Sequence, residues 1–131
     1  ADLAYLGSYT IYHLKLATRL AELQKNGVLI LASGNVVHNL RAVDWRNPDG
    51  GFDWAYRFDE AAEELLTSNP GDVLKLMDHP DYAKAVPTPD HFIPLLYPAS
   101  LAAEGGKLGS FAKGVTVGSI SMTSYSSGMA G

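Results

Sequence analysis

The sequence contains no cysteine among its 131 residues. This excludes disulfide bonds, thiolate nucleophiles and cysteine-ligated zinc sites, so a transition-metal site would have to use imidazole and carboxylate groups. No apolar run reaches the roughly 18 residues that a membrane span needs, and the first residues show no signal-peptide pattern. The lack of cysteine is compatible with a reducing compartment. We therefore expect a cytoplasmic protein without a membrane partner.

Basic residues are few and scattered, with 10 Lys and Arg against 14 Asp and Glu and a net charge of -4. This balance argues against nucleic acid as the main partner, although one or two basic groups could still bind a small anionic substrate. A chain of this length is one domain or part of one. Because it begins at Ala1 and not at Met, we also expect a fragment or a processed chain.

Apolar periodicity in the first half of the chain predicts two elements. Residues 11–25 follow the pattern of an amphipathic helix that ends at Asn26 and Gly27. Residues 28–32 (VLILA) form an aliphatic run whose length is typical of a strand buried on both faces. A helix followed by a buried strand indicates an α/β fold. We therefore expect a mixed central sheet with flanking helices.

The second half predicts further helices and one strand. Residues 52–67 are typical of an amphipathic helix with Asp59 on its solvated face, and residues 115–125 are typical of a strand. Between them, the short helices 72–78 and 80–85 are expected on either side of His79 and Pro80.

Four histidines are present, and their spacing matches no metal motif. His38 follows a break at the end of the predicted strand 28–32, where α/β proteins place their sites. His91 lies in the first turn of a helix whose start is marked by Thr88 and Pro89. A helix amino terminus disfavours the charged imidazolium and favours the neutral ring that a metal needs. An ordinary hydrogen-bonded His38 and an ordinary capping His91 remain open alternatives.

The other histidines and the tryptophans favour structural roles. His13, beside Tyr12 on the first predicted helix, is expected to pack or to support a site, and His79 is expected to be solvated. Trp45 and Trp54 are expected to be core or interface anchors.

Residues 27–41 (GVLILASGNVVHNLR) resemble a signature of the extradiol DOPA dioxygenases, a class that includes protocatechuate 4,5-dioxygenase. Two further blocks, residues 88–97 (TPDHFIPLLY) and 118–125 (GSISMTSY), are similar to that family in order and spacing. The resemblance runs from about Tyr12 to Tyr125. It implies a three-layer α/β fold, of which residues 1–131 would be a single domain or the carboxyl-terminal half, because family members are about twice as long.

The resemblance also implies site roles. The histidine that matches His91 is a metal ligand in the family, and the one that matches His38 is the acid/base or a further ligand. The family's other two metal histidines lie in an amino-terminal half. We add His13 and Tyr125 as candidates for binding substrate or supporting the site. The implied cofactor is one Fe(II) or Zn(II) ion per complete site.

The implied reaction is extradiol ring cleavage of DOPA or a related catechol by O2. Histidine has a pKa suited both to taking a catechol proton and to returning one, whereas zinc fits an imidazole site but cannot supply an electron. Two alternatives stay open: a non-catalytic binding or scaffold relative that lacks the other metal ligands, and a zinc hydrolase. A homo-oligomer is also left open.

Overall fold

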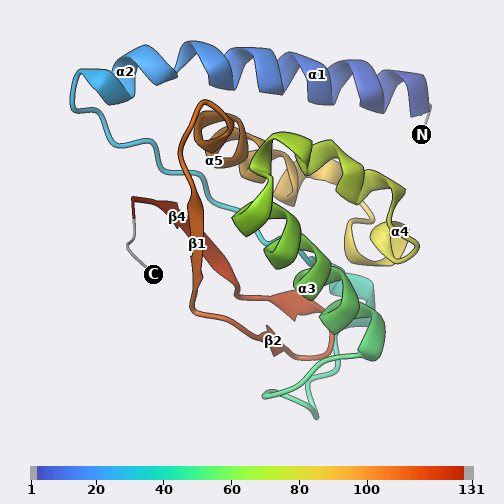
Figure 1. Cartoon of the computed structure of the whole chain (residues 1–131). Helices are drawn as coiled ribbons and strands as arrows, with labels where there is room; N and C mark the ends of the chain where they lie inside the picture. Colours follow the sequence, from blue (N-terminus) through green and yellow to red (C-terminus); the bar gives the residue numbers. More distant parts are fainter. Residues whose placement is uncertain (1–2, 129–131) are drawn as a thin grey trace.

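The computed structural model describes residues 3–128 and is shown in Figure 1. Five α-helices and four short strands lie among the described residues, joined by three 3₁₀ turns. The helices are α1 (Leu3–Arg19), α2 (Ala21–Lys25), α3 (Asp53–Ser68), α4 (Tyr82–Ala85) and α5 (Ile93–Ala103). The strands are β1 (Leu108–Phe111), β2 (Val115–Thr116), β3 (Ile120–Ser121) and β4 (Ser124–Ser127), and the 3₁₀ turns are η1 (Leu40–Ala42), η2 (Pro70–Asp78) and η3 (Pro89–His91).

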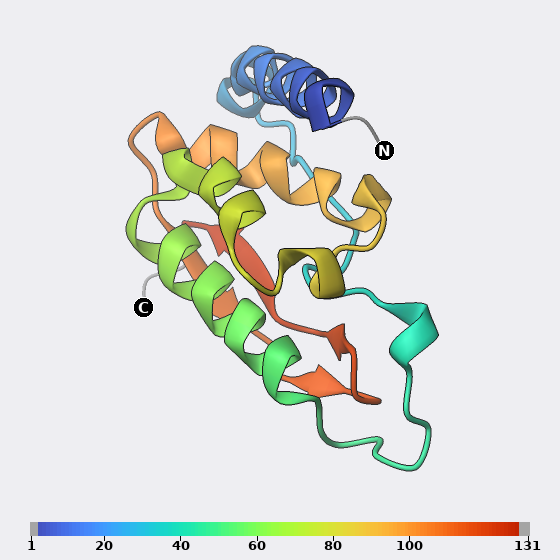
Figure 2. The same ribbon diagram turned by 90° about the vertical axis from the view of Figure 1, so that its right-hand side faces the viewer.

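The elements are stacked in layers. Helix α1 lies across α5, α5 packs in turn on β1 and β4, and α3 also packs on β1 (Figures 1 and 2). The largest fully buried apolar side chains come from α3, α5 and the segments beside them: Phe58, Leu66, Phe92, Leu96, Val37 and Val73. The core therefore lies below α5, and α1 is an outer layer. Among the described residues, no helix is long and apolar enough to cross a membrane.

The α/β class predicted from the sequence is confirmed, with strands that are short and antiparallel. β1 pairs with β4, and β2 pairs with β3. The single strand expected over residues 115–125 is interrupted, because Val117 and Gly118 take positive φ angles of 44° and 84°. Such angles reverse the chain and create the β2–β3 hairpin.

The strand predicted at residues 28–32 is wrong for this structure. The segment is neither helix nor strand, and Leu29 and Leu31 are 86% and 87% exposed. A strand requires a neighbour that accepts and donates its backbone hydrogen bonds, and no described strand pairs with this segment. The aliphatic pattern is that of a strand, but none of the described strands pairs with these residues.

The helix predictions are confirmed with shifted ends. The helix expected at 11–25 begins earlier, at Leu3, and is divided at Leu20 into α1 and α2. It stops as predicted at Asn26 and Gly27, where Gly27 has a φ of +81° and the Val28 amide donates to the Leu23 carbonyl. The helix expected at 52–67 is α3.

The short helices on either side of His79 are confirmed in outline as η2 and α4. The helix start at Thr88 and Pro89 is confirmed as the turn η3, and α5 begins at Ile93. His79, expected to be solvated, is instead half-buried with its ring edge-on to Phe58. Trp45 is 80% exposed and is not a core residue.

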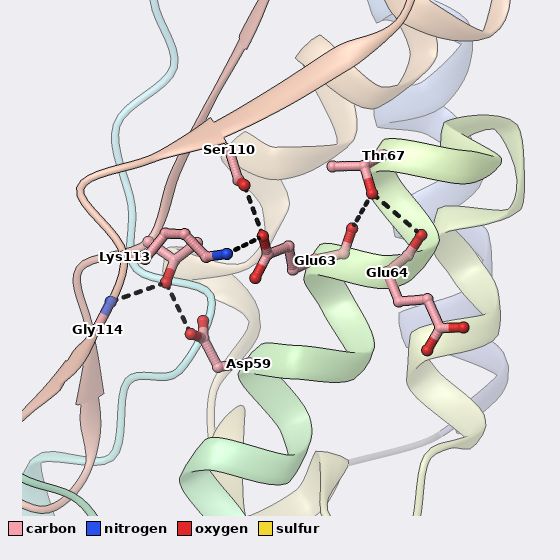
Figure 3. Close-up of polar contacts among 8 residues, drawn as sticks. Asp59, Glu63, Glu64, Thr67, Ser110, Lys113 and Gly114 are labelled. Carbon is pink, nitrogen blue, oxygen red and sulfur yellow. Dashed lines mark hydrogen bonds and ion pairs between the residues drawn. The ribbon is translucent and has the colours of Figure 1, made fainter. Parts of the chain in front are cut away.

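Asp59, expected on the solvated face of α3, is buried. Its carboxylate accepts hydrogen bonds from the hydroxyl groups of Ser121 and Thr123. One turn further along α3, Glu63 accepts a hydrogen bond from Ser110 and pairs with Lys113 at 2.6 Å (Figure 3). Two acidic side chains thus tie α3 to the strands through polar contacts, because the facing strands are rich in hydroxyl groups.

Candidate active site

His38 and His91 lie face to face. Their ring centroids are 3.6 Å apart and their planes differ by 10°. Both line one pocket of about 300 Å³, together with Asn39, Leu40, Arg41, Pro87, Thr88 and Asp90. The fold thus brings together the two histidines that sequence reasoning selected.

The backbone of His38 is fixed on both sides. Val36 and Val37 before it are buried, and the His38 amide donates to the Ala85 carbonyl at 2.8 Å. On the other side, His38 forms an isolated antiparallel bridge with Ile120. The imidazole therefore projects from a segment that is held between α4 and β3.

His91 closes the turn η3 directly before the buried Phe92. Gly34 packs against it so closely that a Cβ at residue 34 would overlap the His91 carbonyl oxygen. Thr88 Oγ1 donates to Asp90 Oδ1 at 2.5 Å, and Asp90 Oδ2 lies 3.5 Å from His91 Nε2. The first turn before α5 therefore holds an imidazole and a carboxylate side by side.

The pocket contains groups of different charge. Burial and the neighbouring His91 lower the pKa of His38, although Asp90 acts in the opposite direction. The hydrogen bond from Thr88 lowers the pKa of Asp90. At neutral pH, the site thus combines a neutral His38 imidazole, an ionised Asp90 and the Arg41 guanidinium.

The two imidazole groups suit a first-row metal ion, but a metal site usually needs at least three protein ligands. Imidazole binds iron and zinc well, yet no group of three or more His, Cys, Asp or Glu residues that could hold a metal occurs within residues 3–128. The two rings would also have to tilt to meet at one ion, since the lone pair of each nitrogen lies in its ring plane. The described residues therefore do not form a metal centre by themselves.

His13 lies elsewhere, between α1 and α5. Its Nδ1 is 2.7 Å from the Tyr97 hydroxyl, and its ring is edge-on to Tyr9 and Tyr12. It does not line the pocket of the histidine pair. A role for His13 in binding substrate stays a prediction.

Tyr125, on β4, also lies outside that pocket. It lines a separate cavity of about 180 Å³ that shares no lining residue with the one around His38 and His91. Its hydroxyl is buried without a hydrogen-bond partner among the described residues, and burial raises its pKa. Its assignment to the site also stays a prediction.

Two charged residues that line the pocket, Arg41 and Asp90, were not predicted as site residues from the sequence. Arg41 lies three residues after His38, and Asp90 directly precedes His91. Their signal was their place within the motif blocks 27–41 and 88–97, which gather charged side chains beside the two histidines.

Comparison with known proteins gives a consistent result. No family model matches the sequence. A curated "4,5-DOPA dioxygenase extradiol" of Escherichia coli (strain K12) is 35% identical, over 76% of this chain and 41% of that protein. One of the same name from Beta vulgaris is 34% identical, over 73% of this chain and 36% of that protein.

A solved structure agrees with the sequence matches. The crystal structure of an uncharacterized protein from Escherichia coli K12 superposes with a TM-score of 0.79 and 33% identity, over 88% of this chain and 49% of that chain. The present chain thus spans about two fifths of the length of the curated relatives it matches. The resemblance to the extradiol DOPA dioxygenases is confirmed, because over the part that it spans this chain is similar to curated proteins of that name.

Proposed function

We propose that this chain supplies His38 and His91 to the active site of an extradiol dioxygenase that opens the ring of DOPA or a related catechol with O2. The observation that carries the proposal is the face-to-face arrangement of the two imidazoles in one pocket. The names of the curated relatives support the same reaction class.

In this proposal the two histidines have different tasks. His38, which favours its neutral form, accepts a proton from a catechol hydroxyl at a ring nitrogen and can return it after ring opening. His91 is a metal ligand, and the remaining ligands come from residues other than those described. When bound, Fe(II) would supply the electron that oxygen activation requires, which zinc cannot do.

Arg41 points to the substrate class. Arg41 lines the same pocket, and none of the ion pairs among the described residues involves its guanidinium. A guanidinium binds carboxylates through two parallel hydrogen bonds. A catechol with a carboxylate, as in an amino acid, therefore fits better than an unsubstituted catechol.

The test uses a hybrid protein, in which this chain replaces the matching half of the Escherichia coli protein of solved structure. The hybrid is loaded anaerobically with Fe(II) and given DOPA and O2, and oxygen uptake and the coloured ring-opened product are followed. We expect turnover, with His38→Gln lowering kcat by about 10²- to 10⁴-fold and His91→Gln lowering the iron content.

His79→Gln, which changes a histidine outside the pocket, is the matched control and should alter neither quantity. An iron-loaded hybrid that consumes no oxygen with any of several catechols would show that the proposal is wrong.

One observation favours a second candidate, a non-catalytic binding relative: the absence of a third metal ligand among the described residues. Metal analysis and the intact mass of the protein purified from its source distinguish the two. One iron per chain favours the enzyme, whereas a 14.0 kDa protein without bound metal favours the binding relative.

A further inference from the structure

We propose that Asn39 is a positioning residue, which holds the turn η1 so that Arg41 lines the pocket and binds the carboxylate of a catechol substrate. The inference rests on the proposed function and on the task of Arg41 in it, and it adds the residue on which that task depends. Its basis is the exposure of η1 and the set of hydrogen bonds that Asn39 makes.

The turn η1 is not fixed by apolar packing. None of its three residues is buried, and Leu40 is 67% exposed. Within the turn, the Ala42 amide donates to the Asn39 carbonyl at 3.1 Å, which closes a single 3₁₀ ring. One such ring does not hold a short turn in water, because the entropy lost in ordering the backbone exceeds what one hydrogen bond supplies. The place of Arg41 therefore depends on the contacts at the ends of η1.

Asn39, directly before η1, is anchored through its backbone. Its amide donates to the Ser119 carbonyl at 3.1 Å, and the Ser119 hydroxyl donates to the Asn39 carbonyl at 2.7 Å. Ser119 is fully buried and lies between β2 and β3. The Asn39 backbone is thus fixed to the β2–β3 hairpin at the point where η1 begins.

The side chain of Asn39 joins two further groups. Its Nδ2 donates to the Lys84 carbonyl on α4 at 2.8 Å, and its Oδ1 accepts a hydrogen bond from the Arg41 amide at 3.2 Å. The second bond makes Asn39 the amino-terminal cap of η1. An asparagine side chain suits this place because it carries a donor and an acceptor on one rigid group. The backbone of Arg41 is thus tied to α4 through one side chain.

The same contacts distinguish positioning from direct contact with the substrate. Asn39 also lines the pocket, but both ends of its side-chain amide face backbone groups. A side chain that bound the catechol ring would, when removed, weaken every catechol alike. Loss of a side chain that acts through Arg41 weakens only substrates with a carboxylate, because the guanidinium must then be ordered at each binding event.

The test replaces Asn39 in the hybrid defined above by alanine and by serine. Both variants lose the bond to the Lys84 carbonyl, whereas serine keeps a neutral oxygen that can cap η1. With Asn39→Ala we expect KM for DOPA to rise about 3- to 30-fold, the factor that corresponds to the loss of one cap. Neither kcat nor KM for unsubstituted catechol should change. Asn39→Ser should return KM for DOPA to within about twofold of the wild-type value.

Asp44→Ala is the matched control. Asp44 Oδ1 accepts a hydrogen bond from the Arg46 amide at 3.1 Å, which is the same contact between residues two apart, made outside the pocket. Its loss should leave KM unchanged for both substrates. The proposal is overturned if Asn39→Ala leaves KM for DOPA unchanged, if it raises KM equally for both substrates, or if serine does not restore the wild-type value.

A second set of measurements does not require turnover. If the hybrid opens no catechol ring, the proposed function fails, and anaerobic equilibrium dialysis of DOPA and catechol then gives Kd values for which the same changes are expected. Amide hydrogen exchange reports the cap itself, in the hybrid or, if that does not fold, in the 131-residue chain. We expect the Arg41 amide to exchange at least about tenfold faster in Asn39→Ala than in the wild type and Asn39→Ser. Equal exchange rates in all three proteins would overturn the proposal.

Discussion

Asp59 is a buried acidic residue whose environment disfavours its charge. Burial raises its pKa above the ordinary value of 3.8, and the hydrogen bonds from Ser121 and Thr123 oppose this only in part. The folded protein therefore holds the proton more tightly than the unfolded chain does. It follows that Asp59 favours folding at low pH, and that this contribution is lost as the pH rises through the raised folded pKa.

Asp59→Asn should remove this pH dependence. From about pH 4 to pH 7, we expect the free energy of unfolding of the variant to increase relative to that of the wild type. Urea unfolding of both proteins at each pH measures the difference, with Glu64→Gln as the control because Glu64 is exposed on the same helix and is not among the charges that shift the pKa of Asp59. Parallel curves for Asp59→Asn and the wild type would contradict the assignment.

Arg41 provides a test of substrate choice. If its guanidinium binds a substrate carboxylate, Arg41→Gln in the hybrid should raise KM for DOPA by about 10- to 100-fold, because a charge-assisted bidentate contact is lost. KM for a catechol without a carboxylate should stay the same. Oxygen uptake measures both constants, and Lys107→Gln, at a cation outside the pocket, is the control. An equal rise for both substrates would exclude this role.

At the residue scale, the sequence predicted the histidine pair but not all of its surroundings. His38 and His91 were selected because their motif blocks matched a family, whereas their spacing alone left ordinary alternatives open. Asp59 was misplaced because helical periodicity shows which residues share a face, not whether the facing strand is polar. Here Ser121 of β3 and Thr123, between β3 and β4, face the helix and make burial of a carboxylate possible.

At the element scale, one contact joins the extended segment before His38 to the turn η3. Because a Cβ at Gly34 would overlap the His91 carbonyl oxygen and crowd Pro94, Gly34→Ala must push the turn away. We expect a loss of about 1–3 kcal/mol in the free energy of unfolding, together with changed NMR signals of the His38 and His91 rings. Urea unfolding and histidine-ring spectra measure the two effects.

Gly7→Ala is the matched control for this substitution. Gly7 lies within α1, and a Cβ there meets no atom within 4 Å. Alanine should therefore stabilise the helix by about 0.5–1 kcal/mol. If Gly34→Ala proved as stable as the wild type, the close packing of Gly34 on His91 would be refuted.

Elements defined by local signals were predicted well. The amphipathic pattern of α3 and the Asn26–Gly27 stop after α2 depend on neighbours a few residues away, and both are confirmed. A strand at residues 28–32 would require a partner strand distant in sequence, which periodicity cannot reveal, and none of the described strands pairs with them. The hairpin β2–β3 was missed because it depends on positive φ at Val117, which a β-branched residue rarely adopts.

At the scale of the whole molecule, the three motif blocks meet. Asn35 of the first block donates to the Ser121 carbonyl of the third at 2.7 Å, and Gly34 packs on His91 of the second. His38 also bridges to Ile120. Segments separated by tens of residues thus meet next to the histidine pair. For this reason a family signature could select His38 and His91 as candidates, whereas residue spacing within one segment could not.

We therefore expect tight metal binding in the hybrid and not in the 131-residue chain alone. Since two imidazoles without a third ligand hold zinc weakly, equimolar Zn²⁺ at tens of micromolar should shift the Tm of the 131-residue chain by less than about 1 °C. The same addition to the hybrid should raise Tm by several degrees, and a chelator should reverse the rise. Calorimetric titration gives the stoichiometry, and His91→Gln in the hybrid should abolish the rise. Tight 1:1 binding by the 131-residue chain alone would show that its own residues complete the metal site.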